Sequence, residues 1–98
     1  KLTTTSTSQV ALLTFAHADF GASEVLINTT AGSARHMTKL LITHDGTTAV
    51  ATEYGAVFTN SELATYDVAI SGTDLELRAT PASVNSTVFN VVTTLLDD

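Results

Sequence analysis

The sequence contains no cysteine and no tryptophan, one proline, and only four lysine and arginine residues among its 98 positions. Without cysteine, neither a disulfide framework nor a thiolate metal site can form. Ten acidic residues give the chain a formal net charge of −6, which would repel a phosphate backbone, so nucleic acid is not an expected partner. Since no apolar run approaches the ~20 residues of a membrane-spanning helix, no membrane partner is expected either.

The composition that remains is typical of a small β-rich domain. A chain of this length buries roughly 65% of its unfolded surface, which suffices for one modest core. Threonine occupies 19 positions and serine 8, and this β-branched, hydroxyl-rich balance favours sheet over helix. We expect a polar N-terminal arm over residues 1–8 and a single domain over residues 9–98.

Short runs of alternating apolar and polar residues, typical of half-buried strands, recur roughly every 8 to 12 residues. The run at 33–44 carries apolar residues on both of its faces. Such strands, joined by short turns, must cover their apolar sides with one another, so we predict an all-β fold, an antiparallel β-sandwich. A small β-barrel is the alternative, because strand number and alternation do not distinguish the two. The seven predicted strands are residues 9–15, 22–30, 33–44, 47–59, 63–71, 74–80 and 87–96.

Glycine positions predict the turns between these strands. Asp45-Gly46 is typical of a type I′ hairpin turn, and Gly72-Thr73 places glycine where a type II′ turn requires it. Gly55 interrupts an alternating run, which indicates a β-bulge. The strands on either side of Gly72-Thr73 are expected to turn four apolar side chains inward: Val68, Ile70, Leu75 and Leu77.

Few residues indicate chemistry. Three histidines, His17, His36 and His44, lie near scattered carboxylates, but zinc prefers three or four convergent ligands. We expect His44 to flank the hairpin turn and the other two to lie in loops or at strand ends. No nucleophile elbow, phosphate-binding glycine loop or zinc-helix motif is present. The sequence therefore predicts no catalytic, cofactor-binding or metal site, and a protein that is not an enzyme.

Several segments together resemble a module of structural proteins of tailed bacteriophages, especially marine and cyanobacterial ones. In that module a strand leads through an Asp-Gly-Thr-Thr turn into Thr-Glu-Tyr-Gly, and a later strand meets a Thr-Pro-Ala corner. The resemblance covers about three-quarters of the chain. It rests on residues 23–27 (SEVLI), 40–59 (LLITHDGTTAVATEYGAVFT), 63–77 (LATYDVAISGTDLEL) and 79–96 (ATPASVNSTVFNVVTTLL).

The resemblance implies a non-enzymatic virion protein that decorates the capsid or forms part of a tail or fibre assembly, with its position on the particle left open. A host-surface or glycan-binding module is the alternative. That alternative requires exposed aromatic side chains, whereas periodicity assigns most aromatic residues here to the core and Tyr54 to its rim.

The last predicted strand carries apolar residues on both faces, and one two-layer sandwich can cover only one of them. We therefore expect contacts with other copies of the chain and with neighbouring virion proteins, as a homo-trimer by analogy with phage fibres and decoration proteins. The predicted interface residues are Leu2 in the arm, and Phe89 and Val91 in the last strand.

Overall fold

A computed structural model describes residues 1–97, which form eight β-strands joined by short loops. The described residues contain no helix of the length and apolar character needed to cross a bilayer. The strands are β1 (Leu2–Thr4), β2 (Val10–Ala16), β3 (Ala22–Ala31), β4 (Ala34–His44), β5 (Ala49–Phe58), β6 (Ala64–Ser71), β7 (Asp74–Pro81) and β8 (Thr87–Leu96).

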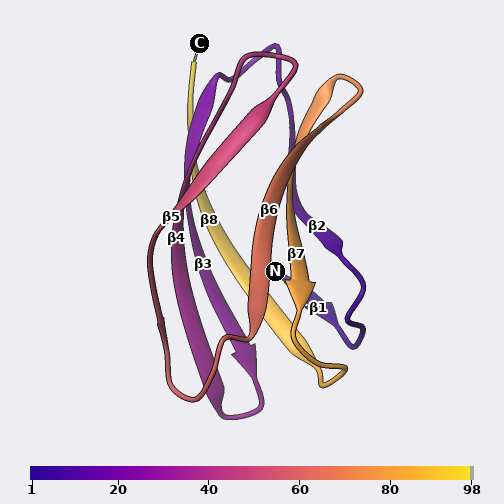
Figure 1. The fold of residues 1–98 in the computed structure, drawn as a ribbon, viewed down its shortest axis with the longest axis vertical. Helices are drawn as coiled ribbons and strands as arrows, with labels where there is room; N and C mark the ends of the chain where they lie inside the picture. The colour runs from indigo at the N-terminus through magenta and orange to yellow at the C-terminus, as the bar shows by residue number, and fades with distance from the viewer. Residues whose placement is uncertain (98) are drawn as a thin grey trace.

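The strands form two antiparallel sheets that pack face to face (Figure 1). One sheet has five strands in the order β1-β8-β3-β4-β5, and the other has three in the order β2-β7-β6. The predicted β-sandwich is confirmed, and the closed barrel is wrong because the strands pair in two separate sheets. In both sheets paired residues share a face, so the pairing register defines an inner and an outer face for each.

The structure contains one strand more than the seven predicted: β1, which lies within the segment predicted as a polar arm. Leu2 pairs with Phe89, and Thr4 pairs with Thr87, so β1 forms one edge of the five-stranded sheet. The main chain of this segment is therefore hydrogen-bonded to its own domain at residues 2–4. A strand of three residues was too short to produce a detectable alternation in the sequence.

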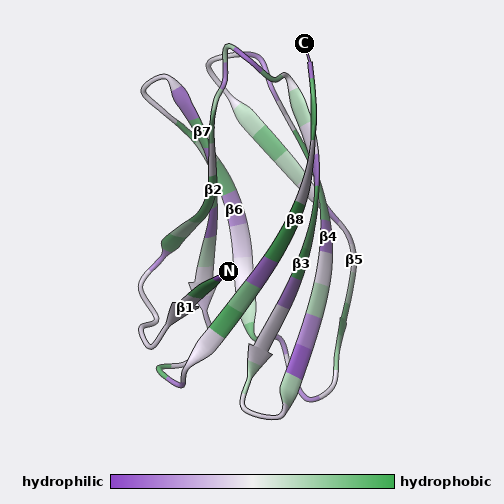
Figure 2. Cartoon of the chain, turned by 180° about the vertical axis from the view of Figure 1, so that it is seen from behind, coloured by the Kyte–Doolittle hydropathy of each residue, from purple (hydrophilic) through white to green (hydrophobic). Residues whose placement is uncertain are grey.

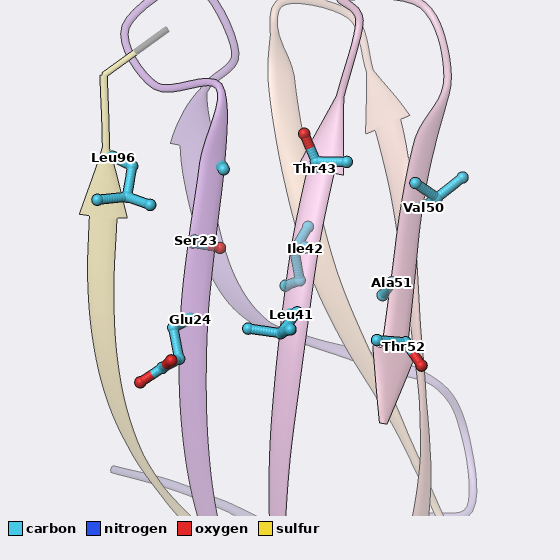
Figure 3. Close-up of a pocket in the computed structure, with 10 residues that line it drawn as sticks. Ser23, Glu24, Leu41, Ile42, Thr43, Val50, Ala51, Thr52 and Leu96 are labelled. Atoms are coloured by element: carbon cyan, nitrogen blue, oxygen red, sulfur yellow. The ribbon is translucent and has the colours of Figure 1, made fainter. Parts of the chain in front are cut away.

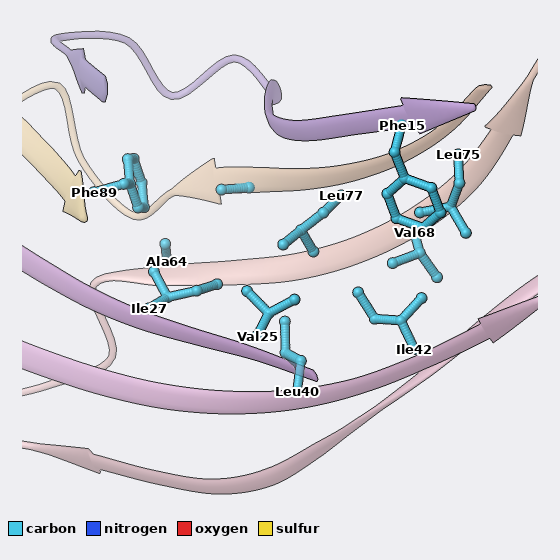
Figure 4. Packing of buried hydrophobic residues seen from close by; sticks show 11 residues of the cluster. Phe15, Val25, Ile27, Leu40, Ile42, Ala64, Val68, Leu75, Leu77 and Phe89 are labelled. Carbon is cyan, nitrogen blue, oxygen red and sulfur yellow. The ribbon is translucent and has the colours of Figure 1, made fainter. Parts of the chain in front are cut away.

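The core lies between the two inner faces (Figure 4). Val68, Leu75 and Leu77 are buried as predicted, and Ile70 is partly buried against the same cluster. The facing sheet supplies Val25, Ile27, Leu40, Ile42 and Phe89. Bands of apolar and polar residues follow one another along β8 and β4 (Figure 2).

The turns follow the glycines. Gly72 has φ +63° and begins a two-residue loop between the paired Ser71 and Asp74, in agreement with the predicted type II′ turn. Gly55 has φ +144° and lies where the register between β4 and β5 shifts, which confirms the bulge. The expected type I′ turn is wrong: Gly46 has φ +87°, but no residue other than glycine has a positive φ among those described.

The loop between β4 and β5 instead spans four residues, 45–48. The Asp45 carboxylate accepts hydrogen bonds from the backbone N–H groups of Thr47 at 2.9 Å and Thr48 at 2.7 Å. These backbone hydrogen bonds, that of Thr48 first, lower the pKa of Asp45 below its ordinary value. An aspartate whose side chain binds the backbone ahead of it stabilises this wider turn, so Asp45 needs no left-handed backbone.

Candidate interaction surface

The outer face of the five-stranded sheet is rich in exposed apolar side chains. Lys39 on β4 pairs with Leu26 on β3, which pairs with Val92 on β8, and all three point away from the core. Val57 is 71% exposed and Val92 65%. We call this surface the apolar face. Its large exposed hydrophobic side chains are Met37, Leu41, Val50, Tyr54, Val57, Val92 and Leu96.

A groove of about 550 Å³ opens on the apolar face near the end where β8 finishes (Figure 3). Leu96 of β8 lies on one side, Leu41 and Thr43 of β4 in the middle, and Val50 of β5 on the other side. The Glu24 side chain borders it on β3. Aliphatic side chains and threonines can exclude water from an apolar partner, but they offer few directed hydrogen bonds.

The charges on the apolar face nearly balance. Lys39 Nζ lies 3.5 Å from Glu24 Oε2 and 5.2 Å from the centroid of the Tyr54 ring. Arg35, nearer the β3–β4 turn, donates hydrogen bonds to the carbonyl oxygens of Gly32 at 2.8 Å and Ala34 at 3.0 Å. Because Glu24 offsets the charge of Lys39 and the Arg35 charge has only neutral hydrogen-bond partners, this face keeps one net positive charge.

The outer face of the three-stranded sheet has the opposite character. Asp67 on β6 pairs with Arg78 on β7, and Thr14 on β2 pairs with Glu76. Arg78 Nη2 lies 2.8 Å from Glu76 Oε1. We call this surface the polar face, and it contributes none of the large exposed hydrophobic side chains among the described residues.

The three residues predicted at an interface lie on the core side of the five-stranded sheet. Phe89 has no exposed surface and belongs to the core, and its ring meets that of Tyr66 with centroids 6.4 Å apart. Leu2 and Val91 are partly buried against the same cluster. The sandwich covers this side of β8 itself, so the exposed apolar residues on the outward side of the strand are Val92 and Leu96. A contact of Leu2 or Val91 with another subunit stays a prediction.

The aromatic residues are less uniformly buried than periodicity indicated. Tyr54 is 66% exposed and Phe58 49%, so the assignment of Tyr54 to the rim of the core is wrong. Both belong to β5, an edge strand in which every residue after Ala49 is exposed. Alternation along β5 could not show that the second sheet fails to cover it.

Tyr66 is the aromatic residue that connects the two sheets by a hydrogen bond. Its hydroxyl lies 2.7 Å from Thr29 Oγ1 on β3. Burial raises the pKa of Tyr66, the Thr29 hydrogen bond opposes that shift, and the negative charges of Glu53 and Glu62 reinforce it. The hydroxyl is therefore a structural contact and is held in its neutral form.

The histidines also make structural contacts. His44 ends β4, as expected beside the turn, with Nε2 2.6 Å from the Phe20 carbonyl oxygen and Nδ1 accepting the Gly46 N–H at 2.9 Å. His17 lies in a loop, with Nε2 3.2 Å from the Gly72 carbonyl oxygen. Within residues 1–97 no group of three or more His, Cys, Asp or Glu side chains is arranged to hold a metal ion.

His36 differs from expectation because it is buried, 1% exposed, on the inner face of β4. Its Nδ1 accepts the Leu63 N–H at 3.2 Å, and its Nε2 lies 3.1 Å from Thr38 Oγ1. A polar ring can occupy this position because both of its nitrogens have partners. The contact with Leu63 is not predictable from local sequence, because it joins β4 to the residue that precedes β6 in the other sheet.

Sequence analysis missed the apolar face as a single surface, although one signal for it was present. The run at 33–44 has apolar residues on both faces, and the outward set on β4 includes Met37 and Leu41. β8 also has apolar residues on both faces, but the predicted interface residues Phe89 and Val91 form its inner set, and Val92 and Leu96 belong to the outer one. Only the pairing of β8 with β3 and of β3 with β4 shows that the outward residues form one patch.

Comparison with known proteins relates the fold to a phage protein. No model of a known protein family matches the sequence, and no curated protein is detectably similar. Among solved structures, the chain is similar to the tailspike protein of Acinetobacter phage vB_ApiP_P1, with a TM-score of 0.65 and 21% sequence identity. The match covers 93% of this chain and 20% of the tailspike chain. Nearly the whole sandwich thus has the fold of one part of a phage tailspike.

Proposed function

We propose that the chain is a non-enzymatic structural module of a tail or fibre assembly in the virion of a tailed phage. The observation that carries the proposal is the similarity of almost the entire fold to part of a phage tailspike. That match favours a tail or fibre position over capsid decoration. The sequence resemblance independently supports a phage structural protein, and it favours phages of marine or cyanobacterial hosts as the source.

The contacts of the polar side chains are consistent with a purely structural role. Both ring nitrogens of His36 and of His44 are engaged in hydrogen bonds with backbone groups or a threonine hydroxyl, so neither ring has a free nitrogen to act as a general base. The Asp45 carboxylate is similarly engaged with its own turn. Two packed sheets joined by short loops form a rigid unit suited to repetition in a particle.

The proposed partners are other copies of the chain, assembled as a homo-trimer, and neighbouring virion proteins. Several copies held in one assembly gain avidity from individually weak contacts, which suits a small domain on a particle surface. The exposed apolar residues of the five-stranded sheet support such contacts, because exposed apolar patches commonly mark protein–protein interaction sites.

The location is tested by labelling intact particles. An antibody raised against the folded chain is applied to purified virions of the phage that encodes it, and bound antibody is located by electron microscopy. Label on the tail or its fibres is expected. Label confined to the head would refute the tail assignment, and protein found in infected cells but not in purified particles would refute the virion role.

A glycan-binding module is the second candidate, and the exposure of Tyr54 and Phe58 favours it. Exposed aromatic rings are the platforms on which sugars commonly stack. Against it, the Lys39 ammonium lies over the Tyr54 ring, and the apolar face has few groups that could orient sugar hydroxyls. Saturable binding of the isolated chain to a defined sugar on a glycan array, lost in Tyr54→Ala, would favour this candidate.

A further inference from the structure

We infer that the apolar face is the surface through which copies of this chain pack on one another. The inference rests on the proposed assembly and names the part of the domain that makes it. It replaces the core-side residues of β8 with the outward ones, Val92 and Leu96, joined by Met37 and Leu41 of β4 and Val57 of β5.

The distribution of charge favours a second copy as the occupant. The chain has six more acidic than basic residues, so two copies that approach at random repel each other. The apolar face is the exception, because its charged residues are Glu24, Arg35 and Lys39, one acid and two bases. The polar face, by contrast, carries two acids and one base, Asp67, Glu76 and Arg78. Packing on the apolar face leaves the acidic surface of each copy turned toward solvent.

The area of the apolar face also approaches that needed for a specific interface between two copies. Its four long strands, β3, β4, β5 and β8, have 10, 11, 10 and 10 residues. At about 3.4 Å per residue and about 4.8 Å between strands, they span about 650 Å². Each partner in a standard stable interface contributes about 800 Å², so the face approaches the size that a specific association needs.

The two edges of the five-stranded sheet offer a less favourable route to association than its outer face. β5 has an unpaired edge, but the bulge at Gly55 interrupts the regular backbone that an added strand would need. The opposite edge is β1, which has only three residues. Short and bulged edge strands discourage strand addition, so the broad face is the better contact.

The test compares the association of matched lysine variants by sedimentation velocity over a wide concentration range. Val92→Lys and Leu41→Lys place a charge on the apolar face, and Thr14→Lys places the same charge on the polar face. Each substitution makes the net charge less negative, so general repulsion cannot cause dissociation. We expect the wild type and Thr14→Lys to assemble, and the two apolar-face variants to associate at least tenfold more weakly. Circular dichroism verifies that all four proteins are folded.

A second measurement locates the contact directly and uses the absence of native cysteine. Val92→Cys and Thr14→Cys are treated with a short bismaleimide cross-linker, and cross-linking between chains is expected only for Val92→Cys. A wild type that stays monomeric throughout, an assembly unaffected by Val92→Lys and Leu41→Lys, or cross-linking only through Thr14→Cys would overturn the inference. None of these results alters where antibody labels the virion, so the two proposals can fail separately.

Discussion

The two sheets of this sandwich share one core but differ on their outer faces. The three-stranded sheet presents Asp67, Glu76 and Arg78 outward, as expected for a face exposed to water. The five-stranded sheet presents Val57 and Val92 outward, each more than half exposed. Burial of the inner faces explains folding, but it does not explain apolar residues on one outer face. In the proposed assembly, the second set of apolar residues serves association.

The largest expected effects test whether the inner faces of the two sheets contribute equally to the free energy of unfolding. Leu77 on β7 and Ile27 on β3 have no exposed surface and face each other's sheets. Leu77→Ala and Ile27→Ala should each lower the free energy of unfolding by about 2–5 kcal/mol, through lost burial and the cavity that remains. Urea unfolding at low protein concentration measures both. A loss below 1 kcal/mol for only one of them would show that its sheet contributes little to the core.

The next comparison concerns the two hairpins at the same end of the sandwich. Gly46 and Gly72 have positive φ, and an added Cβ would meet no atom within 4 Å at either position. Gly46→Val and Gly72→Val should therefore cost about 1–3 kcal/mol each through backbone strain alone. The measurement is the shift of the urea midpoint. An unchanged midpoint for either variant would show that its loop adopts another conformation without cost.

The two sheets also differ in how much of their structure could be predicted from the sequence, because their strands differ in how clearly apolar and polar residues alternate. Along β6 and β7 one face is apolar and the other polar, so alternation alone placed Val68 and Leu77 inside. Along β8 both faces carry valine, and local sequence cannot determine which one is buried. The contact between His36 and Leu63, the exposure of Tyr54 and the pairing of β1 all depend on long-range placement of strands, which periodicity does not contain.

The pH dependence of stability should also distinguish the hairpins. The lowered pKa of Asp45 means that the folded state favours its ionised form. The stabilisation is therefore complete above the ordinary aspartate pKa and is lost as the pH falls through the lower pKa of the folded state. Asp45→Asn keeps an oxygen acceptor without the charge, so its melting temperature should fall less than that of the wild type between pH 5 and pH 2. Parallel melting profiles for the two proteins would contradict this account of the β4–β5 turn.

The smallest expected effect concerns two buried hydroxyl groups on β3, one that is hydrogen-bonded to the opposite sheet and one that is not. Ser23 is buried on the inner face of β3, and its hydroxyl lacks a hydrogen-bond partner among the described residues. Thr29, on the same face of the same strand, holds the Tyr66 hydroxyl of the opposite sheet at 2.7 Å. Ser23→Ala removes an unsatisfied group and should leave the free energy of unfolding unchanged or raise it by up to about 1 kcal/mol, whereas Thr29→Val should lower it by about 1–3 kcal/mol. Urea unfolding compares both with the wild type, and a loss for Ser23→Ala as large as that for Thr29→Val would show that the Ser23 hydroxyl has a stabilising partner, such as a bound water.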